Sequence, residues 1–211
     1  MPATPATGAV VRAEDIVVQF PGGKTPALAG VSFELEVGDG LVVTGDEGCG
    51  KSTLLRVLAG VVRPSYGTVS LFGGPAQASS ARRRLGFGPE TRPFPSGLRT
   101  RDVVDLVALV RGYPDTDVGA ILERVGAAGV ALRRVERLEV EDSRRLSLAC
   151  ALIGDPDLIV LDDPWEFPET IDEIAAARAR GAAVVVASPD PGGFPALLGR
   201  TLTLDQGAGV A

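Results

Sequence analysis

The sequence predicts an α/β fold with a mainly parallel central sheet and an inserted helical block. Continuous apolar runs recur along the chain, and such runs are typical of parallel strands that are buried on both faces. Segments with helical spacing separate most of these runs, which implies right-handed crossovers between parallel strands. Between residues 96 and 153 this alternation stops and three helical patterns follow one another. We therefore expect a separate helical lobe there.

The expected elements follow from local periodicity and from turn residues. Strands are expected at residues 10–20, 31–37, 41–44, 68–72, 85–88, 158–161, 183–187 and 200–204. Helices are expected at residues 101–111, 118–126, 144–153 and 171–180, together with one that opens at Lys51 and ends near Gly60, whereas residues 91–97 are expected to be a loop. The resulting organisation is a flexible tail at 1–9, an α/β core at 10–95 and 154–207, a helical subdomain at 96–153 and a second tail at 208–211.

Composition narrows the class of protein. Apolar residues make up 45% of the 211 residues, enough for a sizeable core, and no run of 18 apolar residues predicts a membrane span. The first nine residues lack the basic start and the apolar stretch of a secretory signal. A net charge of −6 with scattered cations argues against a nucleic-acid partner. Two cysteines are too few for a disulfide framework, so we expect a cytosolic protein, and the absence of histidine excludes histidine-based catalysis.

A glycine-rich loop between an apolar run and a helical pattern organises the chain. Gly45, Gly50, Lys51 and Ser52 satisfy the spacing Gly-x-x-x-x-Gly-Lys-Ser/Thr. Glycines let the backbone turn its N–H groups toward a phosphate, and the following helix presents its positive dipole end to the same anion. The lysine brings charge to the β- and γ-phosphates, and the serine hydroxyl is a ligand for Mg²⁺. The expected nucleotide-binding residues are Gly45, Asp46, Glu47, Gly48, Cys49, Gly50, Lys51, Ser52 and Thr53.

Two adjacent carboxylates follow the apolar run at residues 158–161. Ligands in open α/β sheets bind at the carboxyl ends of strands, so Asp162 is expected to hold Mg²⁺ through water, because Mg²⁺ keeps several of its waters. Asp163 is the candidate for polarising an attacking water. The alternative for Asp163 is a helix N-cap or a turn aspartate.

Over nearly all of residues 10–207, the chain resembles the ATPase subunit of an ABC (ATP-binding cassette) transporter. Residues 45–53 match the family's G-x-x-G-x-G-K-S-T, residues 58–67 resemble its L-A-G-L-x-x-P-x-x-G, and residues 154–164 resemble its G-D-P-x-x-L-L-L-D-E-P. The resemblance implies a P-loop NTPase core with an N-terminal antiparallel β portion, and ATP with Mg²⁺ as cofactors. It also implies transmembrane permease subunits and a second ATP-binding subunit as partners. The expected location is cytoplasmic, peripheral on the inner face of the cell membrane.

Two more site residues are expected from the resemblance alone. Phe20 stands where the family keeps an aromatic that stacks on adenine, and the alternative is a core phenylalanine at a strand end. Glu90 stands where the family has the glutamine that begins the loop joining the core to the helical lobe. As a second catalytic candidate beside Asp163, Glu90 either approaches the metal or weakens phosphate binding through its charge.

The departures from the family pattern concern hydrolysis and dimer contact. The place of L-S-G-G-Q holds residues 138–142, with three carboxylates and a valine and without either glycine. Asp163 is one methylene shorter than the family's catalytic glutamate, and Pro189 stands where the family has its switch histidine. Residues 165–169 replace the family's T-S-G-L-D. The binding half of the motif set is therefore present, whereas the half for hydrolysis and dimer clamping is eroded.

Two functions remain open at this stage. In the first, the chain is a transport ATPase whose chemistry is slow or is rescued by a complementary partner subunit. In the second, it is a non-hydrolysing regulatory or scaffold subunit of a membrane complex that binds nucleotide. A P-loop kinase is a third and weaker alternative. The segment 154–164, which resembles G-D-P-x-x-L-L-L-D-E-P, argues against it.

Overall fold

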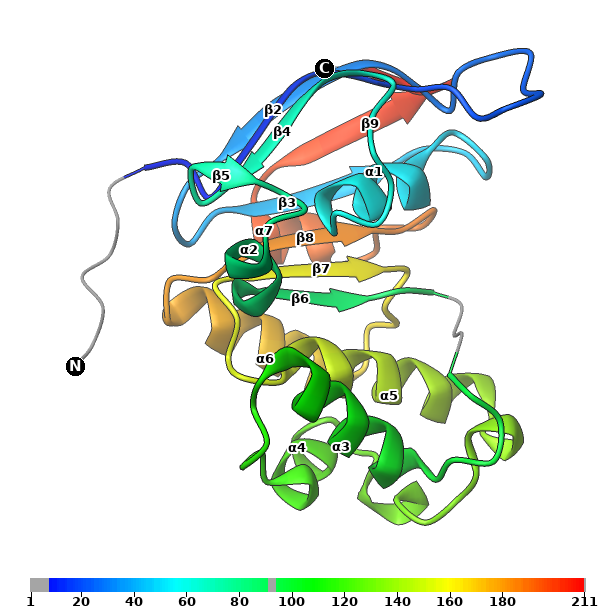
Figure 1. Ribbon diagram of the computed structural model, residues 1–211, viewed down its shortest axis with the longest axis vertical. Coiled ribbons are helices and arrows are strands. Elements are labelled where there is room, and N and C mark those ends of the chain that lie inside the picture. The colour runs from blue at the N-terminus through cyan, green and yellow to red at the C-terminus, as the bar shows by residue number, and fades with distance from the viewer. Residues whose placement is uncertain (1–7, 91–93, 211) are drawn as a thin grey trace.

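A six-stranded sheet forms the centre of the molecule, as the computed structural model of residues 8–90 and 94–210 shows (Figure 1). Its strands, in spatial order, are β10 (Ala208–Val210), β9 (Thr201–Asp205), β3 (Gly40–Thr44), β8 (Ala183–Ala187), β7 (Leu158–Asp162) and β6 (Leu85–Gly88). All neighbouring pairs are parallel except β9 with β10. The mainly parallel sheet expected from the apolar runs is thereby confirmed.

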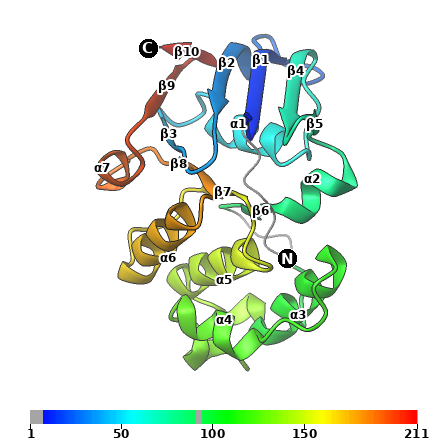
Figure 2. The ribbon, with the colours of Figure 1, turned by 90° about the vertical axis from the view of Figure 1, so that its left-hand side faces the viewer.

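A second, antiparallel sheet covers one face of the first (Figure 2). It consists of β2 (Leu28–Leu35), β1 (Val11–Val18), β4 (Tyr66–Leu71) and β5 (Gly74–Pro75), in that spatial order. The strands β1 and β2 alternate buried and exposed positions because one face meets the core and the other meets water. The antiparallel N-terminal portion is therefore also confirmed.

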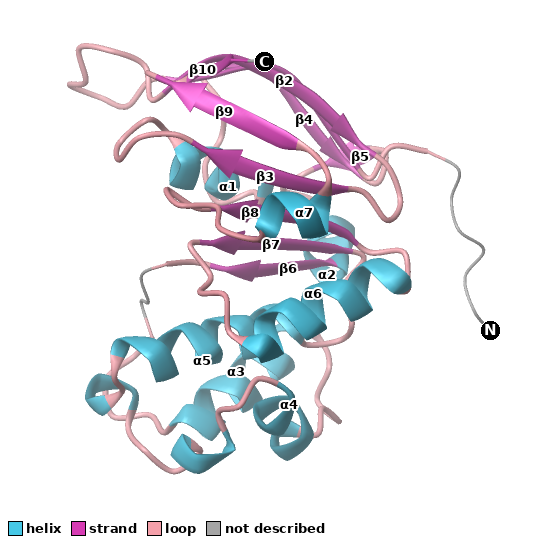
Figure 3. Cartoon of the chain, turned by 180° about the vertical axis from the view of Figure 1, so that it is seen from behind, coloured by secondary structure: helices cyan, strands magenta, loops and turns pink. Residues whose placement is uncertain are grey.

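The inner strands β3, β7 and β8 of the central sheet are buried on both faces, and the alternation of side chains along a strand divides the core into two clusters. Leu158 and Val160 of β7 point into the cluster beneath the antiparallel sheet, together with α1 (Lys51–Leu58). Ile159 and Leu161 of the same strand point into the cluster on the other face. That other face carries α6 (Pro168–Ala179) and α7 (Phe194–Leu198), as the view from behind shows (Figure 3).

The helical block lies beside β6 and shares the second cluster with the sheet. It contains α3 (Thr100–Arg111), α4 (Val118–Arg124), α5 (Val140–Leu152) and two short 3₁₀ helices, Ala128–Val130 and Val135–Arg137. Residues of α3, α4 and α5 belong to the same buried cluster as Ile159 and Val184 of the sheet. The block is thus not a lobe with a core of its own, and the boundaries 96 and 153 stay a proposed subdivision.

Several elements differ from the expectation. The tail expected at residues 208–211 is wrong for Ala208–Val210, which form β10 and pair with β9. The third helix of the block begins at Val140 rather than at residue 144. The helix opened by Lys51 ends at Leu58, because Gly60 has a positive φ of 68° and turns the chain. Periodicity did not indicate the short elements β5, α2 (Ser79–Arg84) and α7.

Two of the expected segments lie partly or mostly outside the residues that the structure describes. The expected loop at residues 91–97 lies partly outside the described residues, and its described part, 94–97, has no helix or strand. The tail expected at residues 1–9 lies mostly outside them. Within the ranges 8–90 and 94–210, no helix has the length and apolar character that a bilayer crossing requires.

Arg111, the last residue of α3, ties the helical block to the sheet. Its guanidinium donates to the backbone oxygens of Leu85 in β6 at 2.7 Å and of Cys150 in α5 at 3.2 Å. Burial lowers the pKa of Arg111, which shows that its desolvation is costly. The guanidinium thus satisfies carbonyl groups at a junction where water has little access.

Replacing Arg111 with alanine is expected to destabilise the chain by about 2 kcal/mol or more, because buried carbonyls lose a charged donor. Urea unfolding followed by circular dichroism measures this change. Arg101→Ala on the exposed face of the same helix is the matched control and is expected to change stability by less than about 0.5 kcal/mol. Equal effects of the two changes would contradict the assigned role of Arg111.

Candidate nucleotide-binding site

The carboxyl ends of β3, β6, β7 and β8 lie at one edge of the central sheet, because these strands are parallel. The loop after β3 leads into α1, and the ends of β7 and β8 carry Asp162 and Ala187. A pocket of about 310 Å³ opens at this edge. Its lining residues are Ala27, Glu47, Gly48, Gly50, Lys51, Ser52, Thr53, Glu90, Asp162, Asp163, Ala187 and Pro189.

Two glycines of the loop are required by their surroundings. Gly45 has a φ of 136° and Gly50 a φ of 107°, both in the region that favours glycine. A Cβ atom on Gly45 would meet the backbone oxygen of Leu204 and, at 2.8 Å, the Cys49 sulfur. On Gly50 it would meet the backbone oxygen of Ala27. The loop is therefore held between β9 and the segment before β2. It leads directly into the N-terminus of α1.

Lys51 is held above the loop by the loop's own carbonyl oxygens. Its ammonium group donates to the oxygen of Gly45 at 2.6 Å and to that of Asp46 at 2.8 Å. Its third donor contacts the Cys49 sulfur at 3.7 Å, a weak acceptor that an anion at the mouth of the loop can replace. Cys49 lies beneath the lysine and is buried. The loop thus places a cation and a helix N-terminus at one point, which suits a phosphate.

Ser52 and Asp162 form the second part of the site. The Ser52 hydroxyl donates to Asp162 Oδ1 at 3.1 Å. Asp162 Oδ2 is buried and accepts no hydrogen bond from any residue that the structure describes. Burial raises the pKa of Asp162, the hydrogen bond from Ser52 opposes the rise, and the nearby charge of Glu90 adds to it.

This donor set fits a hydrated Mg²⁺ ion. A hydroxyl and a carboxylate are oxygen ligands of the kind that Mg²⁺ prefers, and the unpartnered Oδ2 atom is available to a metal-bound water. Bringing a cation to this edge also offsets the cost of the buried carboxylate. Ser52 and Asp162, which the sequence singled out separately, are thus side by side.

Asp163 is engaged by groups of this same chain. Its carboxylate Oδ2 accepts a hydrogen bond from Arg144 at 2.7 Å, and the Ser188 hydroxyl lies 3.4 Å from Oδ1. Its φ of 49° is unusual for a residue other than glycine. The N-cap alternative is wrong, because α6 begins five residues later with Phe167 as its N-cap. Asp163 is a turn residue whose side chain faces the pocket.

The remaining expected residues lie at the border of the site. Glu90 lines the pocket and lies 3.6 Å from Arg144 across an ion pair. Phe20 follows β1 and is 44% exposed, so the alternative of a core phenylalanine is wrong. Its stacking on adenine and the catalytic role of Glu90 stay proposals. Pro189 lines the pocket directly after Ser188.

Residues 138–142 form the beginning of α5, where Glu139 is the N-cap residue and Val140 is 61% exposed. Glu141 and Asp142 occupy the first turn, where negative charge stabilises a helix N-terminus. Asp142 pairs with Arg133 at 3.4 Å, and Glu141 pairs with Arg145 at 3.1 Å. The carboxylates of Glu141 and Asp142 place negative charge at this helix end, which disfavours the binding of an anion there.

Comparison with known proteins shows the family. A sequence model described as "ABC transporter" matches residues 28–166. The taurine import ATP-binding protein TauB of Pseudomonas entomophila is 33% identical over 164 residues, which cover 74% of this chain and 61% of that protein. The hemin import ATP-binding protein HmuV of Nocardia farcinica is 34% identical over 227 aligned positions, covering 98% and 78%. The zinc import ATP-binding protein ZnuC of Paracoccus denitrificans is 34% identical, covering 86% and 70%.

Solved structures show the same fold. An ATP-binding subunit of an ABC transporter has a TM-score of 0.81 at 19% identity, covering 96% of this chain and 88% of that one. A dimeric ATP-binding cassette bound to ADP and phosphate has a TM-score of 0.84 at 20% identity, covering 95% and 97%.

The chain belongs to the ABC transporter family, as an ATP-binding cassette. It spans 61% and 63% of the length of the taurine and sulfonate relatives. The cassettes of this family bind ATP, generally with Mg²⁺.

Two residues of the candidate site were not predicted from the sequence. Arg144 reaches the site from the helical block, and Ser188 reaches it from the end of β8. The signal for Ser188 was its place directly after a buried strand, next to Pro189. No local pattern indicated Arg144, because its contacts with Asp163 and Glu90 depend on how α5 packs against β6 and β7.

Asp162→Asn is expected to raise the melting temperature of the metal-free chain at neutral pH, because it removes a buried charge and keeps an acceptor for Ser52. Thermal unfolding in EDTA measures this gain. Because the folded-state pKa of Asp162 is raised, ionisation costs stability as pH rises through that pKa. The gain in melting temperature should therefore vanish below about pH 3.8, the ordinary pKa of an aspartate. There the wild-type Asp162 is protonated and is as uncharged as the asparagine of the variant.

The matched control is Asp172→Asn on the exposed side of α6, which is expected to leave the melting temperature unchanged. Addition of Mg·ATP should raise the melting temperature of the wild type more than that of Asp162→Asn. A variant that is less stable than the wild type in EDTA would contradict the assignment of Asp162 as a costly buried carboxylate.

Proposed function

We propose that this chain is the ATP-binding subunit of a membrane import complex and that it binds Mg·ATP but hydrolyses it slowly. The observation that carries the binding is the loop of Gly45–Lys51 beside the Ser52–Asp162 pair. Import is proposed because the curated relatives are named as import proteins. Their names cover taurine, aliphatic sulfonates, zinc and hemin, so the proposal leaves the cargo open.

Each part of the site has a proposed role. Backbone N–H groups of the loop cradle the phosphates, and Lys51 turns its ammonium group toward the β- and γ-phosphates. Ser52 ligates Mg²⁺ directly, and Asp162 orients a water of its shell. When bound, Mg²⁺ neutralises phosphate charge and fixes the geometry of the phosphate chain. Phe20, which is exposed after the end of β1, stacks on adenine.

Slow hydrolysis is proposed from three features of the chain. Asp163, the candidate base, is engaged by Arg144 and is one methylene too short by the family pattern, and misplacement of about 1 Å can cost roughly 10²-fold. Pro189 offers no donor at the position of the family's histidine. The beginning of α5 carries carboxylates that repel a partner's γ-phosphate.

A partner subunit does not remove all of these defects. With an intact partner, this chain's ATP would meet an intact signature but would keep Asp163 and Pro189. The partner's ATP would have an intact base but would face residues 138–142. Each of the two ATP sites of such a dimer thus keeps at least one defect. This supports the second candidate function, a non-hydrolysing regulatory or scaffold subunit.

The proposed partners are transmembrane permease subunits and a second ATP-binding subunit, as a homo- or heterodimer. The dimeric cassette among the structural neighbours supports the second partner. The location proposed from these partners is the cytoplasmic side of the cell membrane, where the chain would be peripheral. We propose no nucleic-acid partner, in line with the net charge of −6.

Lys51→Ala is expected to weaken Mg·ATP binding by roughly tenfold to a hundredfold, because a charge-assisted hydrogen bond contributes about 1.5–3 kcal/mol. Isothermal titration calorimetry of the full chain measures this change. Lys24→Ala removes the chain's other lysine, which is exposed, and is expected to bind as the wild type does. A wild type that binds no ATP, or equal affinities of wild type and Lys51→Ala, would refute the proposed site.

Restoring the family residues is expected to raise steady-state hydrolysis. The changes are Asp163→Glu with Pro189→His, and Leu-Ser-Gly-Gly-Gln over residues 138–142. Together they supply a longer base, a donor and a helix end that accepts anions. A phosphate-release assay of the purified chain compares them with the wild type. A wild-type rate of about 1 s⁻¹ or more would contradict the proposal, because this is an ordinary enzyme rate.

A further inference from the structure

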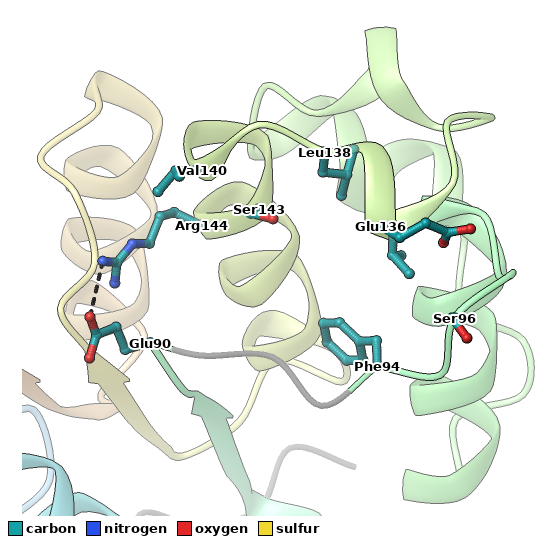
Figure 4. A pocket seen from close by; sticks show the side chains of 9 residues that line it. Glu90, Phe94, Ser96, Glu136, Leu138, Val140, Ser143 and Arg144 are labelled. Carbon is teal, nitrogen blue, oxygen red and sulfur yellow. Dashed lines mark ion pairs between the residues drawn. The ribbon is translucent and has the colours of Figure 1, made fainter.

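Arg144 belongs to α5, and its side chain reaches the residues that follow the carboxyl ends of β6 and β7. Its side chain is 11% exposed, and its guanidinium contacts Glu90 after β6 at 3.6 Å (Figure 4). It also donates to the carboxylate of Asp163 at 2.7 Å and to that residue's backbone oxygen. The Trp165 ring lies 5.8 Å from it, within the range of a cation–π contact. Several partners thus fix one guanidinium against the end of β7.

Arg144 stands behind the carboxylates as seen from the nucleotide pocket. Glu90 and Asp163 line the pocket at the phosphate loop. Arg144 instead lines a neighbouring pocket of about 510 Å³, together with Glu90 and residues of the helical block such as Val140 (Figure 4). Arg144 therefore contacts the nucleotide pocket through two of the carboxylates that line it.

We propose that Arg144 is a positioning residue that holds Asp163 away from the attacking water and thereby keeps ATP hydrolysis slow. This inference rests on the proposed function, in which Asp163 is the candidate base. In hydrolysis, the water oxygen forms a bond to the γ-phosphorus while the bond between that phosphorus and the β–γ bridging oxygen breaks. ADP leaves, and a proton of the water passes to the carboxylate of Asp163.

The contacts of Asp163 oppose this proton transfer. Oδ2 accepts from the guanidinium, whereas the Ser188 hydroxyl, which lies 3.4 Å from Oδ1, donates at 2.7 Å to the backbone oxygen of Asp190. Each carboxylate oxygen has two lone pairs, so Asp163 accepts from water only in the orientation that its bonds to Arg144 leave open. The two bonds that Arg144 makes to the side chain and the backbone of Asp163 fix the orientation of the carboxylate. The Asp163 N–H is tied as well, to Ala187 O at 2.7 Å.

The test compares Arg144→Gln with Arg144→Lys in single-turnover hydrolysis of Mg·ATP by the full chain. Glutamine removes the charge, and lysine keeps the charge but loses the planar fork that reaches two groups at once. Arg144→Gln is expected to raise the rate by about tenfold or more, since a positioned base contributes about 10²–10⁴-fold. Arg144→Lys is expected to give a smaller rise. Arg133→Gln, which breaks the ion pair with Asp142 at the start of α5, is the matched control and should leave the rate unchanged.

Trp165 gives a second readout that needs no nucleotide. It is the chain's single tryptophan and is 40% exposed, with Arg144 beside its ring. Loss of the guanidinium should expose the ring further. Quenching of its fluorescence by acrylamide is therefore expected to increase in Arg144→Gln and to stay at the wild-type level in Arg133→Gln.

The outcomes separate this inference from the proposed function. A wild type that binds no Mg·ATP refutes the proposed function, independently of the tryptophan readout. If the wild type binds and Arg144→Gln hydrolyses no faster, the positioning role is wrong. Adding Asp163→Asn to Arg144→Gln should abolish the gain, and a gain that persists would overturn the route through Asp163. If Arg144→Gln does not fold, Arg144→Lys decides, and a wild-type rate in that variant overturns the inference.

Discussion

The hydrogen bond from Ser52 to Asp162 joins two segments that are 110 residues apart in sequence, and the rest of the site depends on it. It requires that the loop after β3 and the end of β7 lie at the same edge of the sheet. The strand order meets this requirement because β8 pairs in parallel with both β3 and β7. The edge therefore gathers a cation, a helix N-terminus and an acidic group within one pocket.

A buried carboxylate with an unpartnered oxygen is costly in an isolated domain. Asp162 keeps such an oxygen, and burial raises its pKa, so the site is less stable than an apolar alternative would be. In the proposed function, a bound Mg²⁺ ion offsets this cost, because it places a positive charge beside Asp162. The proposal therefore couples binding to stability at this residue.

A separate set of contacts fixes the orientation of the Asp163 carboxylate. Arginines of the helical block reach across to the sheet: Arg111 holds carbonyl oxygens of β6 and α5, and Arg144 holds the turn after β7. Because α5 also shares the apolar cluster of the central sheet, the block and the sheet are packed as one body around the site. The same packing that builds the binding edge thereby engages the group proposed for hydrolysis.

The sequence indicates the residues of the candidate phosphate loop and Asp162 because their signals are local. Gly45, Gly50 and Lys51 stand at fixed spacing in one loop, and Asp162 directly follows a buried strand, so periodicity and turn chemistry suffice. The fold class followed in the same way from continuous apolar runs. The contacts of Arg144 and Ser188 were not predictable, because they arise where separate elements meet in space. Likewise, β10 was missed because its three residues are too few to show a period.

The central claim is that the chain binds Mg·ATP without turning it over at an ordinary rate. Its most direct test is to load the purified chain with α-labelled Mg·ATP, so that ADP keeps the label, isolate the complex on a desalting column, and identify the bound nucleotide over time. The bound nucleotide is expected to remain ATP for minutes. Recovery of ADP within seconds, corresponding to about 1 s⁻¹, would contradict it.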